Sequence, residues 1–207
     1  MTDLDAFLPK VLPFAPGCPE PVAFEHILNA AGDFCETTRL WRFDDTFEVG
    51  KDPNIVRVPQ GAVIHEIERC DFNGCRLEPR GIGWLDEQCP DWRSDENMLT
   101  GQPRYFTQIE PDTVRVVPHS TGRLKVWLRL KPAGDAKQLP DFLLREHGTV
   151  IGWGALAGIL MLPNQTFTDP NRATYFQTRF DAALARLAKR QSSGQMRAPI
   201  RTKANFL

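Results

Sequence analysis

The sequence lacks an apolar segment long enough to cross a lipid bilayer. Its longest apolar run, TVIGWGALAGILMLP, covers residues 149–163, whereas a membrane-spanning helix needs about 20 such residues. The run contains three glycines, but no predicted strand comes directly before it, as a phosphate-binding glycine loop would require. We therefore interpret it as part of a packed helix, and we expect no membrane partner.

The chain also has almost no net charge. Its 207 residues include 25 Lys and Arg and 26 Asp and Glu, which gives a formal net charge of −1. This balance provides no overall attraction to nucleic acid or to anionic lipid. A nucleic-acid-binding role would therefore have to depend on a local basic segment.

Patterns typical of metal sites and catalytic sites are missing as well. The five cysteines are an odd number, and the N-terminus MTDLDAFLPK is acidic before it is apolar, unlike a secretory signal. Cys70 and Cys75 bracket an Asn-Gly turn, but they provide only half of a zinc site. No serine or cysteine stands in a nucleophile-elbow motif. The histidines lie in four different predicted elements: His26, His65, His119 and His147. We expect free thiols in a reducing compartment, no cofactor, no metal and no enzymatic activity.

Helical and β-rich segments follow one another in blocks. Apolar residues three and four apart predict a helix from about Cys18 to Leu40, a second from Leu139 to Leu162, and a last one that begins at Asp169-Pro170. Between the first two helices, short segments bounded by turn residues predict strands. The predicted strands cover residues 42–49, 54–58, 62–72, 75–79, 104–110, 113–117 and 123–130. Residues 81–98 are rich in acidic residues and tryptophan and are expected to be irregular.

Consecutive strands set between helices indicate an α+β fold rather than an alternating α/β fold. We predict a helical bundle, with one N-terminal helix and two C-terminal helices, that carries an inserted β-rich module similar to a small sandwich or barrel. The predicted organisation is an N-terminal arm (1–17), a helical bundle (18–40 and 136–190), a β-rich module (41–135) and an extended basic C-terminal arm (191–207).

Small residues recur along the second-to-last predicted helix. Gly148 and Gly152 are four residues apart, as are Gly154 and Gly158, and Ala155 lies beside them. Residues four apart share a helix face, and each internal glycine costs about 1 kcal/mol relative to alanine. Close packing against another backbone would compensate for this cost. That backbone belongs either to another segment of the same chain or to another copy of it.

The C-terminal segment is basic and contains no acidic residue after Asp181. Three interpretations remain open: a nucleic-acid contact through arginine and lysine, a flexible arm that orders on a partner protein, and simple disorder. Aromatic residues that could stack on bases are nearly absent from it, which favours the partner protein. The candidate binding residues of the arm are Arg197, Pro199, Ile200, Arg201, Lys203, Phe206 and Leu207.

The order of short motifs along the chain resembles the head-to-tail adaptor proteins of tailed bacteriophages, the tail tubular protein A type or neck connectors. No single motif is specific, but together they extend over nearly the full length. They are LPKVLP (8–13), AAGDFCE (30–36), GQPRYF (101–106), VRVVP (114–118), LPD (139–141), GALA (154–157), LMLP (160–163) and Asp169-Pro170.

This resemblance implies a structural virion protein. Such adaptors form a ring, typically of twelve copies, beneath the portal protein, where they extend the DNA channel and provide a platform for a downstream tail or nozzle protein and for tail fibres. Genomic DNA passes through the ring without sequence-specific binding. The resemblance further implies that the helical bundle builds the ring wall and that residues 191–207 bind the portal. The expected location is the virion neck, after assembly in the host cytoplasm.

Overall fold

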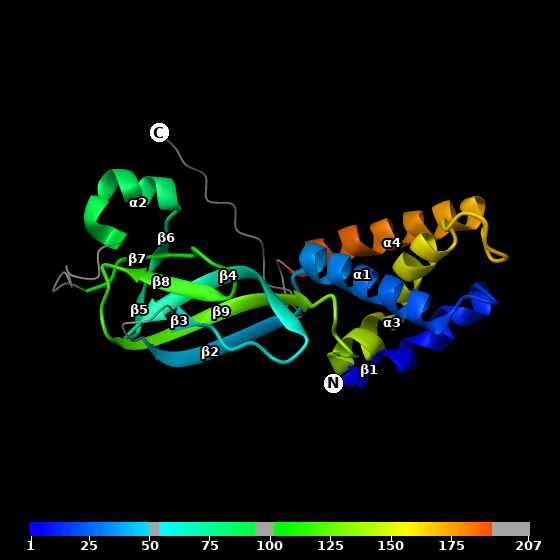
Figure 1. Ribbon diagram of the computed structural model, residues 1–207, viewed down its shortest axis with the longest axis horizontal. Coiled ribbons are helices and arrows are strands. Elements are labelled where there is room, and N and C mark those ends of the chain that lie inside the picture. Colours follow the sequence, from blue (N-terminus) through cyan, green and yellow to red (C-terminus); the bar gives the residue numbers. More distant parts are fainter. Residues whose placement is uncertain (50–53, 94–101, 192–207) are drawn as a thin grey trace. The chain divides into compact units, whose positions relative to one another are not determined.

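The computed structural model describes residues 1–49, 54–93 and 102–191. Its residues form two compact units, one over Met1–Leu40 and Pro132–Leu207 (the helical unit) and one over Trp41–Lys131 (the β unit). Figure 1 shows the elements of each unit along the chain. The mixed helical and strand content confirms the predicted α+β class.

The helical unit is a bundle of three long helices with short elements from the N-terminus. Helix α3 packs against both α1 and α4 (Figure 1). Its core comes from all three helices, through residues such as Ile27, Phe34, Ile151 and Phe180. The elements of this unit are β1 (Thr2–Asp3), η1 (Leu4–Lys10), η2 (Leu12–Phe14), α1 (Glu20–Thr38), β10 (Gln138–Leu139), α3 (Asp141–Ile159) and α4 (Pro170–Gln191).

The helix boundaries follow from residues at the ends. Pro19 precedes α1 in an extended conformation, and Arg39 ends this helix with a left-handed φ of 51°. The Asp169 carboxylate accepts a hydrogen bond from the Arg172 backbone N–H (3.0 Å), so Asp169 caps α4 and Pro170 takes its first position. The predicted start of this last helix is therefore confirmed.

Residues 1–17, for which the sequence analysis predicted a separate arm, fold against the helices instead. Strand β1 pairs with β10, and the 3-10 helix η1 contacts both α1 and α3. Phe7, Val11 and Ala15 are fully buried. Three apolar side chains at spacings of four explain why this short segment docks rather than extends.

The β unit contains two four-stranded sheets, with strand orders β2-β9-β4-β5 and β3-β8-β7-β6. All the pairings of known register are antiparallel except β6 with β7, which is parallel. The interior is filled by alternate residues of the long strands, such as Leu124 and Val126 of β9 and Val114 and Val116 of β8. The strands are β2 (Arg42–Val49), β3 (Asn54–Ile55), β4 (Ala62–Phe72), β5 (Cys75–Arg76), β6 (Glu78–Pro79), β7 (Tyr105–Thr107), β8 (Thr113–Val117) and β9 (Gly122–Pro132).

The predicted Asn-Gly hairpin is confirmed. Phe72 pairs with Cys75 across the turn, and Asn73 and Gly74 both have positive φ, 47° and 83°, as a tight two-residue hairpin turn requires. The strand predicted over residues 75–79 is interrupted at Leu77, which is buried. Residues before and after Leu77 belong to different sheets, so the chain passes from one sheet to the other there.

The expectation of an irregular segment after residue 80 is wrong for the part that the structure describes. Helix α2 (Ile82–Gln88) and the 3-10 helix η3 (Pro90–Arg93) lie there. Leu85 and Trp92 are buried in a small cluster with Val117 of β8. Burial of these large side chains stabilises a short helix that local propensity alone would not indicate.

Candidate interaction surface

The outer face of the sheet β2-β9-β4-β5 carries charged and aromatic side chains. Along β9, Leu124, Val126 and Leu128 are buried, whereas Arg123, Lys125 and Trp127 alternate with them. Since successive side chains of a strand point to opposite faces, the second set lies on the outer face. The β2 residues opposite Trp127 and Arg129 are Asp44 and Arg42, so charges from two strands meet there.

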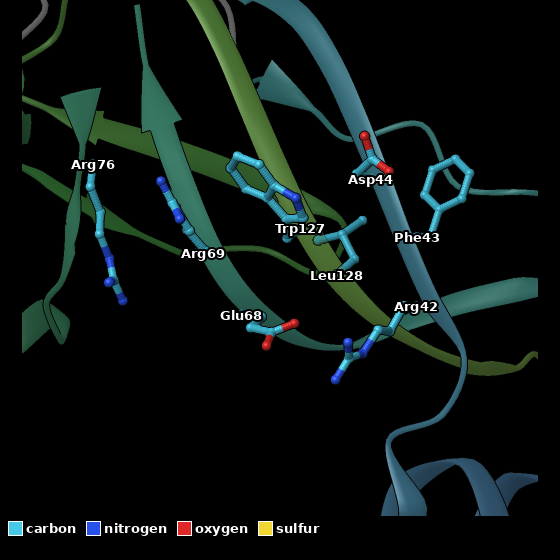
Figure 2. A pocket seen from close by; sticks show the side chains of 8 residues that line it. All are labelled: Arg42, Phe43, Asp44, Glu68, Arg69, Arg76, Trp127 and Leu128. Carbon is cyan, nitrogen blue, oxygen red and sulfur yellow. The ribbon is translucent and has the colours of Figure 1, made fainter. Parts of the chain in front are cut away.

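This face is hollowed around Trp127 (Figure 2), with a volume of about 560 Å³. Trp127 lies between β4, which provides Arg69, and β2, which provides Asp44. The eight lining residues come from four strands of one sheet: Arg42, Phe43, Asp44, Glu68, Arg69, Arg76, Trp127 and Leu128. We refer to it as the Trp127 hollow.

Cations surround the Trp127 ring. The Arg69 guanidinium carbon lies 4.9 Å from the ring centroid, and the Lys125 ammonium nitrogen lies 4.8 Å from it, which are distances for favourable cation–π contacts. Arg69 donates hydrogen bonds to both carboxylate oxygens of Asp71 (2.6 and 2.5 Å), and Lys125 pairs with Asp44 at 3.1 Å. These contacts hold the ring and its neighbouring charges in one arrangement.

Arg129 is a buried cation at the edge of the hollow. Its side chain is 6% exposed and donates a 2.7 Å hydrogen bond from Nη2 to Oε1 of Glu68, whose side chain is 46% exposed. A guanidinium remains charged at any physiological pH, so it needs negative charge beside it when water is excluded. Glu68 provides such a charge across the two strands β4 and β9.

A second aromatic and cationic cluster lies around α2. Arg80 stacks over Trp84 (4.6 Å) and over Tyr105 (5.5 Å). Beside it, the Asp86 carboxylate accepts hydrogen bonds from the indole N–H of Trp92 and from Arg93. The Trp92 hydrogen bond first, and then the Arg93 hydrogen bonds, lower the pKa of Asp86. The cluster fixes α2 on the sheet.

The side chains of the Trp127 hollow are of the types found in protein interfaces. Among residues 1–49, 54–93 and 102–191, no three His, Cys, Asp or Glu side chains are grouped so that they could hold a metal ion. Burial raises the pKa of the Cys35 and Cys70 thiols to about 12, so neither is a nucleophile at neutral pH. The Trp127 hollow instead combines tryptophan and arginine, the residue types that most often dominate protein interfaces.

Three of the predicted glycines of α3, Gly152, Gly154 and Gly158, face other segments of the same chain. A Cβ atom at Gly152 would lie 3.3 Å from the Lys10 carbonyl oxygen, and one at Gly154 would lie 2.9 Å from Cβ of Ala30 and from the ring of Phe180. At Gly158 it would lie inside contact distance of the His26 imidazole, whereas at Gly148 the nearest atoms belong to Leu143 and Leu144 of its own helix. Ala155 is fully buried. Gly152, Gly154 and Gly158 thus lie where η1, α1 and α4 approach α3.

The predicted arm residues lie outside the described part of the chain, which ends at residue 191. The structure therefore does not place any of them on a surface.

The Trp127 hollow could not be predicted from the sequence, because residues that meet beside it, such as Glu68 and Arg129, are 61 positions apart. The sequence did contain one signal of this surface. Charged and apolar residues alternate along β9, which predicted the strand, and Trp127 is the one aromatic residue among the outward-facing positions of that strand.

Two histidines of the helical unit predict a stability that depends on pH. Burial lowers the pKa of His26, which packs against Gly158, and of His147, whose ring centroid lies 4.8 Å from that of Phe34. The unfolded chain, with histidine pKa values near 6.5, therefore takes up protons before the folded chain does. Stability present above pH 6.5 should be lost as the pH falls through the folded pKa values.

Urea unfolding followed by circular dichroism at pH 7.5 and pH 5.5 measures this effect. We expect a lower free energy of unfolding at pH 5.5, and a smaller difference between the two pH values in H26Q/H147Q. An unchanged difference in the double variant would assign the pH dependence to other groups.

No helix within the described ranges is both long and apolar enough to span a membrane.

Comparisons with known proteins indicate the family of the chain. No curated protein matches the chain. A family model described as SU10 adaptor protein matches residues 17–203, which is most of both units and of the C-terminal segment. The chain therefore belongs to the SU10 adaptor protein family, a family of phage head-tail adaptors.

Proposed function

We propose that this protein is a head-to-tail adaptor of the tail tubular protein A type, which forms a ring of twelve copies beneath the portal in the virion neck. The ring extends the DNA channel and provides the platform for the next tail component. The observation that carries this proposal is the family match over residues 17–203. The structural role of the family also supports a non-enzymatic function.

The two units take different parts in this proposal. The helical unit builds the ring wall, and residues 191–207 bind the portal through the apolar and basic side chains from Arg197 to Leu207. The β unit is free to contact the downstream tail or nozzle protein or the tail fibres, and the Trp127 hollow is the surface on it with suitable residues. The copies join the portal in the host cytoplasm, and genomic DNA later passes through the channel without sequence-specific contacts.

Mass photometry of the purified portal complex with added protein tests this function. We expect the full-length chain to join the portal in about twelve copies, since that is the typical ring of such adaptors, and a chain truncated after Arg190 to bind at least tenfold more weakly. Circular dichroism of the truncated chain serves as the control for folding, because the truncation leaves α1 and α3 intact.

If neither form binds the portal, the adaptor proposal fails. The basic tail would then direct the next measurement to DNA. A nucleic-acid-binding protein would show an affinity that falls steeply with salt and that is lost on truncation.

A further inference from the structure

Helix α4 carries a row of exposed arginines. Arg172, Arg179 and Arg186 are seven residues apart, and all three are exposed. Seven residues make almost two helical turns, so the three side chains leave the same side of the helix about 10 Å apart. The row borders the side of α4 that packs in the bundle, where Ala173, Phe176 and similar apolar residues are buried.

The middle arginine is held in place on the surface. The Arg179 guanidinium lies 4.6 Å from the ring centroid of Trp153 on α3 and 5.6 Å from that of Tyr175. It also donates a 2.7 Å hydrogen bond to the Tyr175 hydroxyl. Tyr175 itself is 54% exposed. A fixed arginine beside partly exposed tyrosine and tryptophan is the composition of an interface hot spot, because less conformational entropy is lost on binding.

Helix α1 offers the complementary charge. It contains four acidic residues and no lysine or arginine. Glu25, Asn29 and Asp33 are exposed and four residues apart, so they form one face of the helix. Glu25 and Asp33 are separated by eight residues, or about 12 Å along the axis, close to the spacing of neighbouring arginines on α4.

The two rows lie on different helices of one bundle, and both α1 and α4 pack on α3. Within the described residues, Glu25, Arg172 and Arg186 make no ion pair. We propose that the arginine row of one copy binds the acidic face of α1 on the next copy. This inference rests on the proposed ring, and it names the residues that join its subunits.

A contact between two different surfaces of the same chain leads from copy to copy and closes into a ring when the rotation permits. The second copy is preferred to DNA as the occupant because the chain itself supplies a matching acidic face with similar spacing. DNA would also meet the exposed Tyr175 ring beside Arg179 rather than a continuous basic surface.

Charge reversal tests the contact with the full-length chain and the portal complex. One variant, R172E/R186E, makes the α4 row acidic. A second, E25K/N29K, makes the α1 face basic and leaves Asp33, which has contacts inside the chain, in place. The matched control, K137E/R145E, makes the same charge change as the first variant at two exposed residues of the helical unit outside α4. Circular dichroism verifies that each variant folds.

We expect each reversed variant alone to give incomplete rings at 0.15 M salt, with at least a tenfold loss of affinity between copies, and the control to assemble normally. An equimolar mixture of the two reversed variants should restore complete rings, because acidic α4 rows then alternate with basic α1 faces. Complete rings should also dissociate more readily at 1 M salt, where charges are screened.

The outcomes separate this inference from the adaptor function. If the wild-type chain completes a ring and both reversed variants do so equally well, the contact is wrong and the adaptor function stands. If the mixture fails to restore rings and R172E/R186E instead loses affinity for duplex DNA, the arginine row is a DNA contact. If the wild-type chain neither binds the portal nor self-associates, both proposals fail.

Discussion

Replacing Gly154 with alanine is expected to destabilise the helical unit by about 1 to 3 kcal/mol, although alanine forms helices better than glycine. The added methyl group would lie 2.9 Å from Cβ of Ala30 and 2.9 Å from the ring of Phe180. Neither neighbour can move easily. The Cβ atom of Ala30 is bonded directly to the backbone of α1, and the Phe180 side chain is buried in the core. The overlap therefore forces α1 or α4 away from α3, which loses contacts along the whole bundle.

Gly32→Ala on α1 provides the matched control. This glycine is also inside a helix, but a Cβ atom there would meet nothing within 4 Å. The substitution should raise the free energy of unfolding by up to about 1 kcal/mol, the difference in helix propensity. Urea unfolding of both variants, followed at 222 nm, measures the opposite signs. A stabilising Gly154→Ala would show that the helices of this bundle do not depend on the small residue for their approach.

Glu68→Gln is expected to destabilise the β unit by about 1 to 2 kcal/mol, because an uncharged amide oxygen binds the Arg129 guanidinium more weakly than a carboxylate does. The substitution keeps the shape of the side chain but removes the negative charge beside Arg129. Because the Arg129 side chain is only 6% exposed, water compensates little of the lost attraction, and the guanidinium cannot lose its proton.

The corresponding change in an exposed ion pair should have little effect. Arg145 and Glu146 form a 3.3 Å pair on α3 with side chains 76% and 50% exposed, so Glu146→Gln should cost about 0.5 kcal/mol or less. Thermal unfolding of the two variants by calorimetry compares them directly. Equal shifts would mean that Glu68 contributes no more than a surface carboxylate, and that other groups compensate the Arg129 charge.

The regular elements were predicted well where local signals mark their ends. Strands β2, β4 and β8 have the predicted bounds, because turn residues flank alternating apolar positions. The prolines before α1 and α3 and the Asp169-Pro170 cap place the helix starts within two residues. These signals act over a few residues, so the sequence contains them in full.

The missed elements depend on partners distant in the sequence. The 3-10 helix η1 looks like an arm because it is short and contains Pro9, yet Phe7 is fully buried in the helical unit. Helix α2 has only seven residues, too few for a stable isolated helix, and it depends on packing against β8. Tertiary burial of this kind overrides local propensity.

The candidate surface could be predicted only in part for the same reason. The spacing of apolar and small residues indicated that β9 is a strand and that the small residues of α3 form a packing face. It could not place Arg69 or Glu68 beside Trp127, because strand order and the pairing of β4 with β9 bring them together. The row formed by Arg172, Arg179 and Arg186 was readable as a repeat of seven, but its exposure depends on which side of α4 meets α3.

The two ends of the β unit lie next to each other. Arg42, at the start of β2, pairs with Arg129 near the end of β9, and the Leu130 N–H donates to the Trp41 carbonyl (2.9 Å). The chain therefore leaves the helical unit and returns to it one strand spacing away, about 5 Å. A few residues would suffice to join α1 to β10 directly. A different module whose ends have a similar spacing could therefore replace the whole β unit without a change in the path of the helices.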